Sequence, residues 1–312
     1  MLRTASFRRT FAALHGTTLR IGACDTGRMT ITDTATSGIQ RSATKRTVLM
    51  CRPTHFTVAY RINPWMHPEE PTDTSLAVHQ WDVLYRTYLD LGFDVHLIDP
   101  VAGLPDMVYA ANGGFVLDGI AYGASFSYSQ RQPEGPAYMD WFAANGFDVR
   151  VPEEVNEGEG DFLLAGDVIL AGTGFRSASD SHAEVARIFG REVVSLQLVD
   201  PSFYHLDTAI AVLDPVPIDG RVTIAYLPSA FDEPSLGILR DRFPDAIIVS
   251  EADAAVLGLN SFSDGRNVVI ASRATDYARE LRERGYHPIG VDLSELLLGG
   301  GGVKCCTLEL RR

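Results

Sequence analysis

Cys305 is the side chain best suited to act as a nucleophile, because it follows a glycine-rich turn. Residues 299–307 read Gly-Gly-Gly-Gly-Val-Lys-Cys-Cys-Thr. Glycines let the backbone approach a ligand closely while a neighbouring side chain is held rigidly. A cysteine thiolate displayed in this way is a strong nucleophile that can form a covalent intermediate. The pair Cys305-Cys306 is also compatible with two small buried hydrophobic residues that begin a terminal strand, so the other motifs must decide.

Four further corners, each polar or rich in glycine, precede Cys305 at intervals of about 45 to 55 residues, and such regular spacing indicates an internal repeat. They are the segments Ala111-Asn112-Gly113-Gly114, Glu157-Gly158-Glu159-Gly160-Asp161, Tyr204-His205-Leu206-Asp207-Thr208 and Gly258-Leu259-Asn260-Ser261. The second corner carries a pair of carboxylates and the third a histidine two residues before an aspartate. Cys305 is therefore the last member of a series of chemically active corners.

The sequence after each corner predicts the same set of elements. After the second corner, two apolar runs are joined by Gly166-Asp167, and such runs joined by Asp-Gly or Gly-Asp are typical of β-hairpins. A helical pattern then covers residues 181–189, and a further apolar strand follows. Residues 274–284 show the same helical pattern after a later hairpin. The repeating unit is therefore strand, strand, helix, strand.

The repeat predicts the fold class. Residues 47–312 divide into five such units, the first beginning at Val48, which predicts a closed α/β ring of five units in a single domain. Equivalent corners of a ring surround one axis, so their side chains should converge on a central cavity. The residues expected there are Asn112, Glu157, Asp161, His205, Asp207 and Cys305.

Composition excludes several classes of protein. The chain has 312 residues, of which 46% are apolar, and no apolar run reaches the 18 residues of a membrane span. The formal charge of −13 argues against a nucleic-acid partner, and an acidic cavity would favour cationic substrates such as guanidines or amines. The same charge could serve only solubility. Four cysteines without a disulfide pattern indicate a reducing, cytoplasmic compartment.

Residues 1–46 differ from the rest of the chain. They are rich in Arg, Thr, Ser and Gly and lack apolar periodicity, so we expect a disordered N-terminal extension. Residues 7–11 resemble a twin-arginine export signal, and the lack of early acidic residues resembles a transit peptide. Polar residues between positions 15 and 20 interrupt the apolar region that an export signal needs. Met29 is an alternative start.

A metal site is a further alternative for these side chains. His205, Asp207, Glu157 and Cys305 are all of the types that bind zinc, but their spacing is not that of a CxxC or HxxxH motif. We therefore predict no metal and no cofactor. Taken one at a time, each residue could also be a core histidine, a strand cap or a turn residue. It is their occurrence at equivalent repeat positions that favours a catalytic site.

Five motifs, in order, resemble those of the guanidino-group-modifying superfamily. They are Met50-Cys51-Arg52-Pro53 continuing to Asn63-Pro64-Trp65-Met66, Leu104-Pro105-Asp106 continuing to Asn112, Glu157-Gly158-x-Gly160-Asp161, His205-Leu206-Asp207-Thr208, and Gly300-Gly301-Gly302-x-x-Cys305-x-Thr307. This superfamily contains arginine deiminases, dimethylarginine dimethylaminohydrolases, agmatine deiminases and amidinotransferases. The resemblance covers essentially everything after residue 46. It implies the pentein fold, a five-bladed α/β propeller.

The resemblance also implies a mechanism that suits these residue types. A guanidinium carbon is a poor electrophile, so its cleavage needs a soft nucleophile and protonation of the leaving nitrogen. By resemblance, Cys305 attacks to form a covalent thiouronium adduct, and His205 acts as acid and then as base for water. Glu157 would orient His205. The expected substrate-binding residues are Asn63, Asn112, Asp161 and Asp207, since carboxylates match the N–H pairs of a guanidinium.

Two departures from the family pattern bear on these assignments. Deiminases usually have Glu-Gly-Gly-Asp, whereas this chain has one extra residue, so either Glu157 or Glu159 could face His205. Asn112 stands where deiminases and dimethylarginine hydrolases usually have an acid. Because an amide can donate as well as accept, Asn112 could hold a neutral ureido product for a second attack.

This second departure predicts the substrate. The pattern is similar to that of arginine dihydrolases, which convert arginine to ornithine, ammonia and carbon dioxide, and we take this as the first prediction. Dimethylargininase, which converts dimethylarginine to citrulline and dimethylamine, is the alternative. Arginine deiminase, amidinotransferase and a non-enzymatic ribosome-binding pentein remain further alternatives. The partner is then a small guanidino molecule, and the sequence is also compatible with a homo-oligomer.

Overall fold

The computed structural model describes residues 41–312. The predicted disorder of residues 1–40, the twin-arginine pattern and Met29 lie outside the described residues. Residues 41–46, which we expected to belong to the extension, pack against the domain. Arg41 Nη1 donates to Asp214 Oδ1 at 2.6 Å, and the Arg41 guanidinium lies 3.4 Å from the centre of the Tyr286 ring. The packed chain thus begins before Thr47, because a buried ion pair and a cation–π contact hold this segment.

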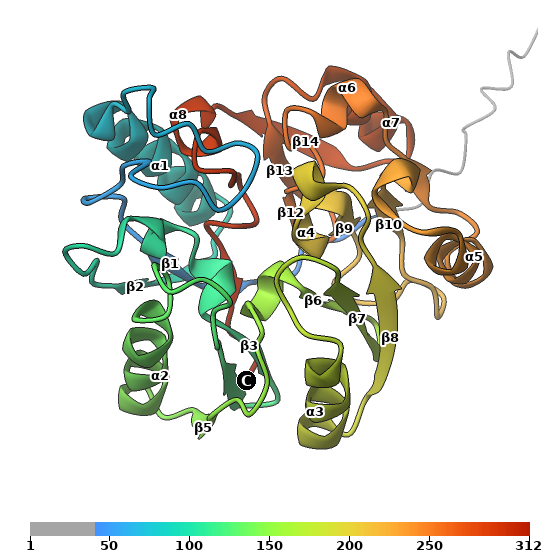
Figure 1. Ribbon diagram of the computed structural model, residues 1–312. Coiled ribbons are helices and arrows are strands. Elements are labelled where there is room, and N and C mark those ends of the chain that lie inside the picture. The colour runs from blue at the N-terminus through green and yellow to red at the C-terminus, as the bar shows by residue number, and fades with distance from the viewer. Residues whose placement is uncertain (1–40) are drawn as a thin grey trace, which may run out of the picture. The chain divides into compact units, whose positions relative to one another are not determined.

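The domain contains five three-stranded sheets, each carrying one of the longer helices (Figure 1). Within each sheet the first two strands are antiparallel, and the third, which follows a helix, runs parallel to the second. Each of four sheets is built, with its helix, from consecutive segments of the chain. The first two of these units are β3 (Gly114–Leu117), β4 (Ile120–Gly123), α2 (Glu134–Ala144) and β5 (Asp148–Arg150), and then β6 (Phe162–Ala165), β7 (Val168–Thr173), α3 (Asp180–Phe189) and β8 (Glu192–Gln197). The other two are β9 (Ile210–Val212), β10 (Ile224–Tyr226), α5 (Glu233–Arg242) and β11 (Ile247–Ile248), and then β12 (Phe262–Ser263), β13 (Asn267–Ala271), α7 (Thr275–Glu283) and β14 (His287–Val291). These four confirm the predicted unit of strand, strand, helix, strand.

The fifth sheet joins the two ends of the described chain. It contains β1 (Thr47–Cys51), α1 (Thr74–Asp90) and β2 (Asp94–Ile98), and its first strand is β15 (Leu308–Glu309). Strand β15 pairs antiparallel with β1, with Val48 opposite Glu309. We expected the first unit to begin at Val48 and the units to follow one another, which is wrong for this sheet. Because no strand precedes β1 among the described residues, the free edge of β1 is paired by the segment that follows the cysteines.

The hairpins form where the sequence supplies residues that tolerate positive φ angles. At the turn between β3 and β4, Asp118 has φ 52° and Gly119 has φ 75°. Two consecutive positive φ angles are those of a type I′ turn, whose twist matches that of the flanking strands. The middle strand of each sheet is apolar and largely buried, as in β1, where Val48, Leu49 and Met50 are fully buried. Such runs are typical of strands covered on both faces.

Short helices occupy the corners that carry the polar motifs. Asn112 lies in η2 (Ala110–Gly113), Glu159 lies in η3 (Gly158–Gly160), and Asp207 lies in α4 (Leu206–Ala209). Other short helices are η1 (Pro105–Val108), η4 (Pro201–Phe203), η5 (Pro228–Ala230), α6 (Glu251–Ala254) and α8 (Ser294–Leu297). Each of η2, η3 and α4 directly precedes the first strand of a sheet. The polar corners are thus rigid one-turn elements at equivalent places in the repeat.

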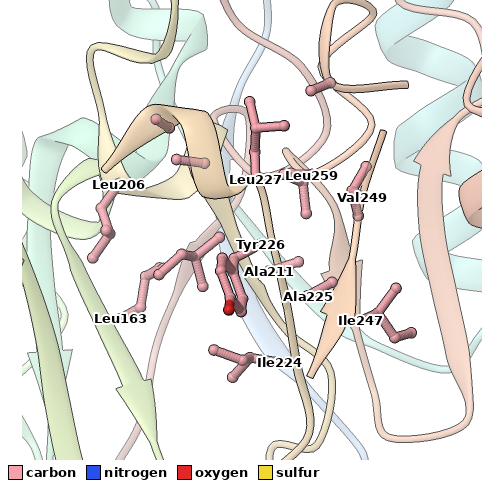
Figure 2. Close-up of a cluster of buried hydrophobic side chains, with 14 of the residues drawn as sticks. Leu163, Leu206, Ala211, Ile224, Ala225, Tyr226, Leu227, Ile247, Val249 and Leu259 are labelled. Atoms are coloured by element: carbon pink, nitrogen blue, oxygen red, sulfur yellow. The ribbon is translucent and has the colours of Figure 1, made fainter. Parts of the chain in front are cut away.

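The apolar core packs against these corners. Its largest cluster surrounds β9, β10 and β11, where Leu163, Leu206 and Ile224 come from different segments (Figure 2). Leu206 belongs to the helical turn that carries Asp207, so packing fixes the position of that carboxyl. Among residues 41–312, no helix is long and apolar enough to cross a membrane. The fold is a mixed α/β fold of five small sheets, as the pseudo-fivefold repeat predicted.

Candidate active site

Cys305 lies in a turn that immediately precedes β15, and not on the strand itself as we expected. The turn is closed by the Thr307 amide and hydroxyl, which donate to the carbonyls of Lys304 and Val303. The side chain of Asn260 holds the cysteine on two sides. Asn260 Nδ2 donates to Cys305 Sγ at 3.1 Å, and Asn260 Oδ1 accepts from the Cys305 amide at 3.0 Å. Cys305 is thereby fixed by a residue from the preceding repeat.

Asp207 is the nearest carboxyl to this thiol. Cys305 Sγ lies 3.5 Å from Asp207 Oδ2, while the buried Asp207 Oδ1 has no hydrogen-bond partner among the described residues. Burial raises the pKa of Asp207 to about 7. Burial also raises the pKa of the Cys305 thiol well above its usual value, and the Asp207 charge adds to this effect. The thiol therefore stays neutral until a positive charge arrives next to it.

His205 and Glu157 form a second pair. Glu157 Oε2 accepts from His205 Nε2 at 2.8 Å, and Arg176 Nη1 donates to the same oxygen at 2.9 Å. Burial alone would raise the pKa of Glu157, but Arg176 and His205 outweigh burial and hold that pKa below its usual range. The other ring nitrogen, His205 Nδ1, is buried and has no partner within the described part of the chain. It is the nitrogen available to exchange a proton with a ligand.

The two pairs are neighbours because His205 directly precedes α4 and Asp207 lies in its first turn. The geometry also decides between the two glutamates of the second corner. Glu159 points away from His205 and accepts from Lys304 Nζ at 2.6 Å and from the Glu309 amide at 2.8 Å. Glu157 is therefore the residue that faces the histidine, and Glu159 binds the segment that carries the nucleophile.

Asn112 and two buried arginines complete one side of the site. Asn112 Oδ1 accepts from Arg131 Nη1 at 2.8 Å, and its Nδ2 donates to the Glu157 carbonyl at 3.4 Å. Arg131 also makes a two-point contact with Glu134, at 3.0 and 2.8 Å. Neither Arg131 nor Arg176 was predicted from the sequence to lie in the site. Each follows its corner residue, Asn112 or Glu157, at the same interval, so a comparison of the two repeats would have found them.

The oxygens of Asp161 are already used within the protein. Asp161 Oδ2 accepts from Ser177 Oγ at 2.6 Å, and Oδ1 accepts from the Leu206 amide at 3.1 Å. Burial raises the pKa of Asp161 to about 6. Asn63 is similarly engaged, since its Nδ2 donates to the Gly299 carbonyl at 3.1 Å. The substrate-binding roles of Asp161 and Asn63 stay predictions, and in the structure both residues tie loops of the site together.

Asp106 adds a carboxyl that we did not single out as a site residue. Its Oδ2 accepts from Tyr60 Oη at 2.9 Å, whereas its Oδ1 is buried without a partner among residues 41–312. Burial raises the pKa of Asp106, and the nearby Arg131 opposes this. An oxygen in this state can accept from a ligand ammonium group. The motif Leu104-Pro105-Asp106 already carried the resemblance, which is the signal that could have identified it.

The structure brings the predicted residues into two hydrogen-bonded pairs and not into a metal-binding cluster. Glu157 pairs with His205, and Asp207 lies beside Cys305. Within the part of the chain that the structure describes, no group of three or more His, Cys, Asp and Glu side chains is arranged to hold a metal ion. A thiol, a carboxyl with a free oxygen and a histidine with a free nitrogen can together carry out nucleophilic substitution at a cationic carbon.

Several known proteins are closely similar to this chain in sequence. The chain is 51% identical over 274 residues to the N(G),N(G)-dimethylarginine dimethylaminohydrolase of Mycobacterium tuberculosis, covering 88% of this chain and 89% of that protein. It is 37% identical over 270 residues to the bifunctional arginine dihydrolase/ornithine cyclodeaminase ArgZ of Synechocystis, covering 84% of this chain and 37% of that protein. No family model matches the chain.

Solved structures of the ArgZ N-terminal domain share the fold, at 36% identity and a TM-score of 0.80, covering 86% of this chain. In one of them a cysteine is replaced by serine and substrate is bound, and that chain is covered to 99%. In another an asparagine is replaced by serine and a reaction intermediate is covalently bound, with 98% covered. A dimethylarginine dimethylaminohydrolase at 17% identity and a TM-score of 0.72 has the same fold.

Proposed function

The chain belongs to the family of guanidino-hydrolysing enzymes that contains dimethylarginine dimethylaminohydrolases and arginine dihydrolases, and we propose that it cleaves dimethylarginine to citrulline and dimethylamine. The 51% identity to a dimethylarginine dimethylaminohydrolase over most of both chains carries this proposal. It favours our alternative prediction, dimethylargininase, over the first prediction, arginine dihydrolase. The active site accounts for the chemistry of either reaction.

In the first half of the reaction, Cys305 Sγ bonds to the guanidino carbon. A guanidinium placed against the unpartnered Asp207 Oδ1 brings a positive charge to the thiol, which lowers its pKa, so the thiol gives up its proton to His205 Nδ1 and attacks as the thiolate. The bond from carbon to the leaving nitrogen breaks, and His205 Nδ1 passes this proton to the nitrogen, which leaves as a neutral amine. Glu157 stabilises the positive charge on His205. A thiouronium adduct on Cys305 remains.

In the second half, His205 acts as a base. It takes one proton from water, whose oxygen bonds to the same carbon, and the carbon–sulfur bond breaks while the second proton of the water passes to the sulfur. The thiol is regenerated, the product carries a neutral ureido group in place of the guanidinium, and His205 releases its proton to solvent. No redox step occurs, and the water supplies the oxygen of the product. This sequence needs only groups that the site provides.

The charged groups around the site favour a free amino acid as the substrate. Arg131 and Arg176 are buried cations whose two-point contacts are already made with Glu134 and Glu157, so they would attract a substrate carboxylate by charge. The unpartnered Asp106 Oδ1 supplies an acceptor for an α-ammonium group. Agmatine has no carboxylate for these two cations to attract, so we expect it to be a poor substrate.

We also propose that the five sheets close into a five-bladed propeller with the site on its axis. The contacts between first strands support closure, since β15 contacts β3, β6 contacts β9, and β9 contacts β12. The short helix η3 contacts both β3 and β6 and so connects their sheets. Closure of this kind would bring side chains from four different corners to one axis, in keeping with the expectation from the repeat.

Arginine dihydrolase is the second candidate, because a specific observation favours it. The asparagine replaced in one ArgZ structure precedes the cysteine replaced in the other by the same number of residues that separate Asn112 from Cys305. The ArgZ domain with that asparagine replaced holds a covalent reaction intermediate. An asparagine at this position would let the site donate to a ureido oxygen and attack the product a second time.

Product analysis separates the two candidates. The purified protein is incubated separately with asymmetric dimethylarginine, arginine, agmatine and citrulline, and the products are identified by mass spectrometry. Citrulline and dimethylamine from dimethylarginine would support the proposal. Ornithine with two equivalents of ammonia from arginine would replace it with the second candidate, and Asn112→Asp should then stop at citrulline. Turnover of none of the four would contradict both and direct attention to amidino transfer.

A further inference from the structure

A cavity of about 160 Å³ lies away from the catalytic residues, among the first strands of several sheets. Strands β6, β9, β12 and β15 contribute to its walls, together with Arg46, Ser261, Lys304 and Arg311. An engineered protein cavity of about 150 Å³ holds a molecule as large as benzene. The cavity therefore has room for a small ligand. Ser261 and Lys304 are the sequence neighbours of Asn260 and Cys305, so the cavity backs onto the active site.

The charged side chains around this cavity do not balance. Three are cationic, namely Arg46, Lys304 and Arg311. They pair with two carboxylates: Glu309 contacts Arg46 and Arg311, and Glu159 contacts Lys304 and Arg311. One positive charge is left over in a largely buried place. A further carboxyl within the electrostatic reach of Lys304 is Asp207, but its side chain faces Cys305 on the other side.

Two polar atoms of the lining have no partner. Arg46 Nε and Ser261 Oγ are both buried, and neither has a hydrogen-bond partner among the described residues, although the Tyr277 hydroxyl, itself without a partner, lies beside Ser261. Ser261 is 6% exposed, so water has little access to its hydroxyl. Both atoms can donate. Buried donors without a partner are uncommon in folded proteins and are often satisfied by a bound group.

We propose that this cavity binds a small oxyanion of the size of phosphate or sulfate. Such an anion would neutralise the excess positive charge, whose burial is otherwise costly. It would accept hydrogen bonds from Arg46 Nε and Ser261 Oγ, and the apolar walls would strengthen its attraction to the three cations. A cationic ligand would meet net positive charge, and an apolar ligand would leave both donors unsatisfied.

Thermal unfolding in the presence of inorganic phosphate tests this site. Scanning calorimetry of the full chain is performed at constant ionic strength while phosphate is increased. Binding to the folded state should raise Tm with the logarithm of the phosphate concentration above the Kd, by about 2 to 3 °C when phosphate exceeds its Kd about tenfold. Arg46→Gln and Ser261→Ala should each reduce this rise. The serine variant removes only a hydroxyl, so it remains informative if the arginine variant folds poorly.

Arg221→Gln is the matched control, because Arg221 is an exposed arginine whose partner, Asp245, is also exposed. It should keep the full phosphate effect. A rise in Tm of equal size in wild type and both cavity variants would overturn the proposal, as would no rise in wild type. A rise that disappears when dimethylarginine or arginine saturates the active site would place phosphate on Arg131 and Arg176 and would also overturn it. Sulfate in place of phosphate should act on the same variants in the same way.

Discussion

Asn260 is the residue whose replacement tests the activation of the nucleophile most directly. Its Oδ1 accepts from the amides of Gly302 and Cys305 at 3.1 and 3.0 Å, and its Nδ2 donates to Cys305 Sγ at 3.1 Å. Nδ2 also donates to the Asp207 carbonyl at 3.1 Å. Asn260→Asp keeps the two acceptor bonds and replaces the donor group with a negative charge, whereas Asn260→Ala removes all four bonds. The two variants therefore separate the electrostatic role of the amide from its role in holding the turn.

The geometry sets the size of each effect. Two like charges at this separation repel by about 5 kcal/mol when the effective dielectric constant is about 20. Since about 1.4 kcal/mol corresponds to a factor of ten, Asn260→Asp should raise the pKa of the Cys305 thiol further and lower kcat/KM near pH 8 by about 10⁴-fold. In Asn260→Ala two buried amides lose their acceptor, which should lower the free energy of unfolding by about 2 to 6 kcal/mol.

The assay is kcat/KM between about pH 6 and 10 for wild type and both variants, together with urea unfolding. Asn260→Asp should also unfold more readily than wild type wherever its buried carboxyl is ionised, and the activity of the folded fraction should recover only at high pH, where the thiol ionises. If the new carboxyl stays protonated at low pH, the loss should grow as pH rises through its pKa before activity recovers. Wild-type activity and an unchanged pH profile in Asn260→Asp would refute this account of thiol activation.

Three further predictions concern the nucleophile, the buried ion pairs and the start of the domain. Cys305→Ser should abolish turnover, whereas Cys306→Ala should retain most of it, because Cys306 is a buried core residue; equal loss in both would contradict the assignment of the nucleophile. Glu159→Gln should cost about 3 to 5 kcal/mol in urea unfolding at neutral pH, since it leaves buried cations without their carboxylate. The pKa of Glu159 is lowered in the folded state, so the stabilisation by its carboxylate is present above the pKa of the unfolded chain and is lost in wild type as pH falls. Equal stability of Glu159→Gln and wild type at pH 7 would exclude this effect. A chain that begins at Thr47 should fold with a lower Tm than one that begins at residue 38, because Asp214 loses its buried arginine partner; equal Tm values would show that the segment contributes nothing.

Much of the fold could be predicted because its signals are local. Asp118-Gly119 and Gly166-Asp167 mark hairpins within a few residues, and the helical patterns end at glycines such as Gly190, which has φ 60°. The pairing of β15 with β1 could not be predicted in this way. It depends on contacts between the two ends of the domain, and no local pattern encodes them. The same limit explains why Cys305 was placed on a strand and not in the preceding turn.

The site was predicted to the extent that residue type determines chemistry. Cys305, His205, Glu157 and Asp207 were identified from type and repeat position, and the structure brings them together in two pairs. The choice between Glu157 and Glu159 needed the backbone, because an inserted residue changes which side chain faces inward. Arg131 and Arg176 were missed because an isolated arginine in a sequence is most often exposed, and only the repeat interval distinguishes these two.

The pairing of β15 with β1 has a consequence for the synthesis of the protein. During translation β1 emerges among the first strands, but the segment that covers its free edge emerges after every other strand. Until then this edge presents unpaired N–H and C=O groups, which can template pairing with another nascent chain. Cys305, the proposed nucleophile, is synthesised in the same last stretch. The chain therefore gains this nucleophile and the strand that protects the β1 edge from aggregation at the same time. Interrupted synthesis therefore yields fragments that lack activity and are prone to aggregate. Rapid completion of the chain, or chaperone protection while it grows, would limit this aggregation.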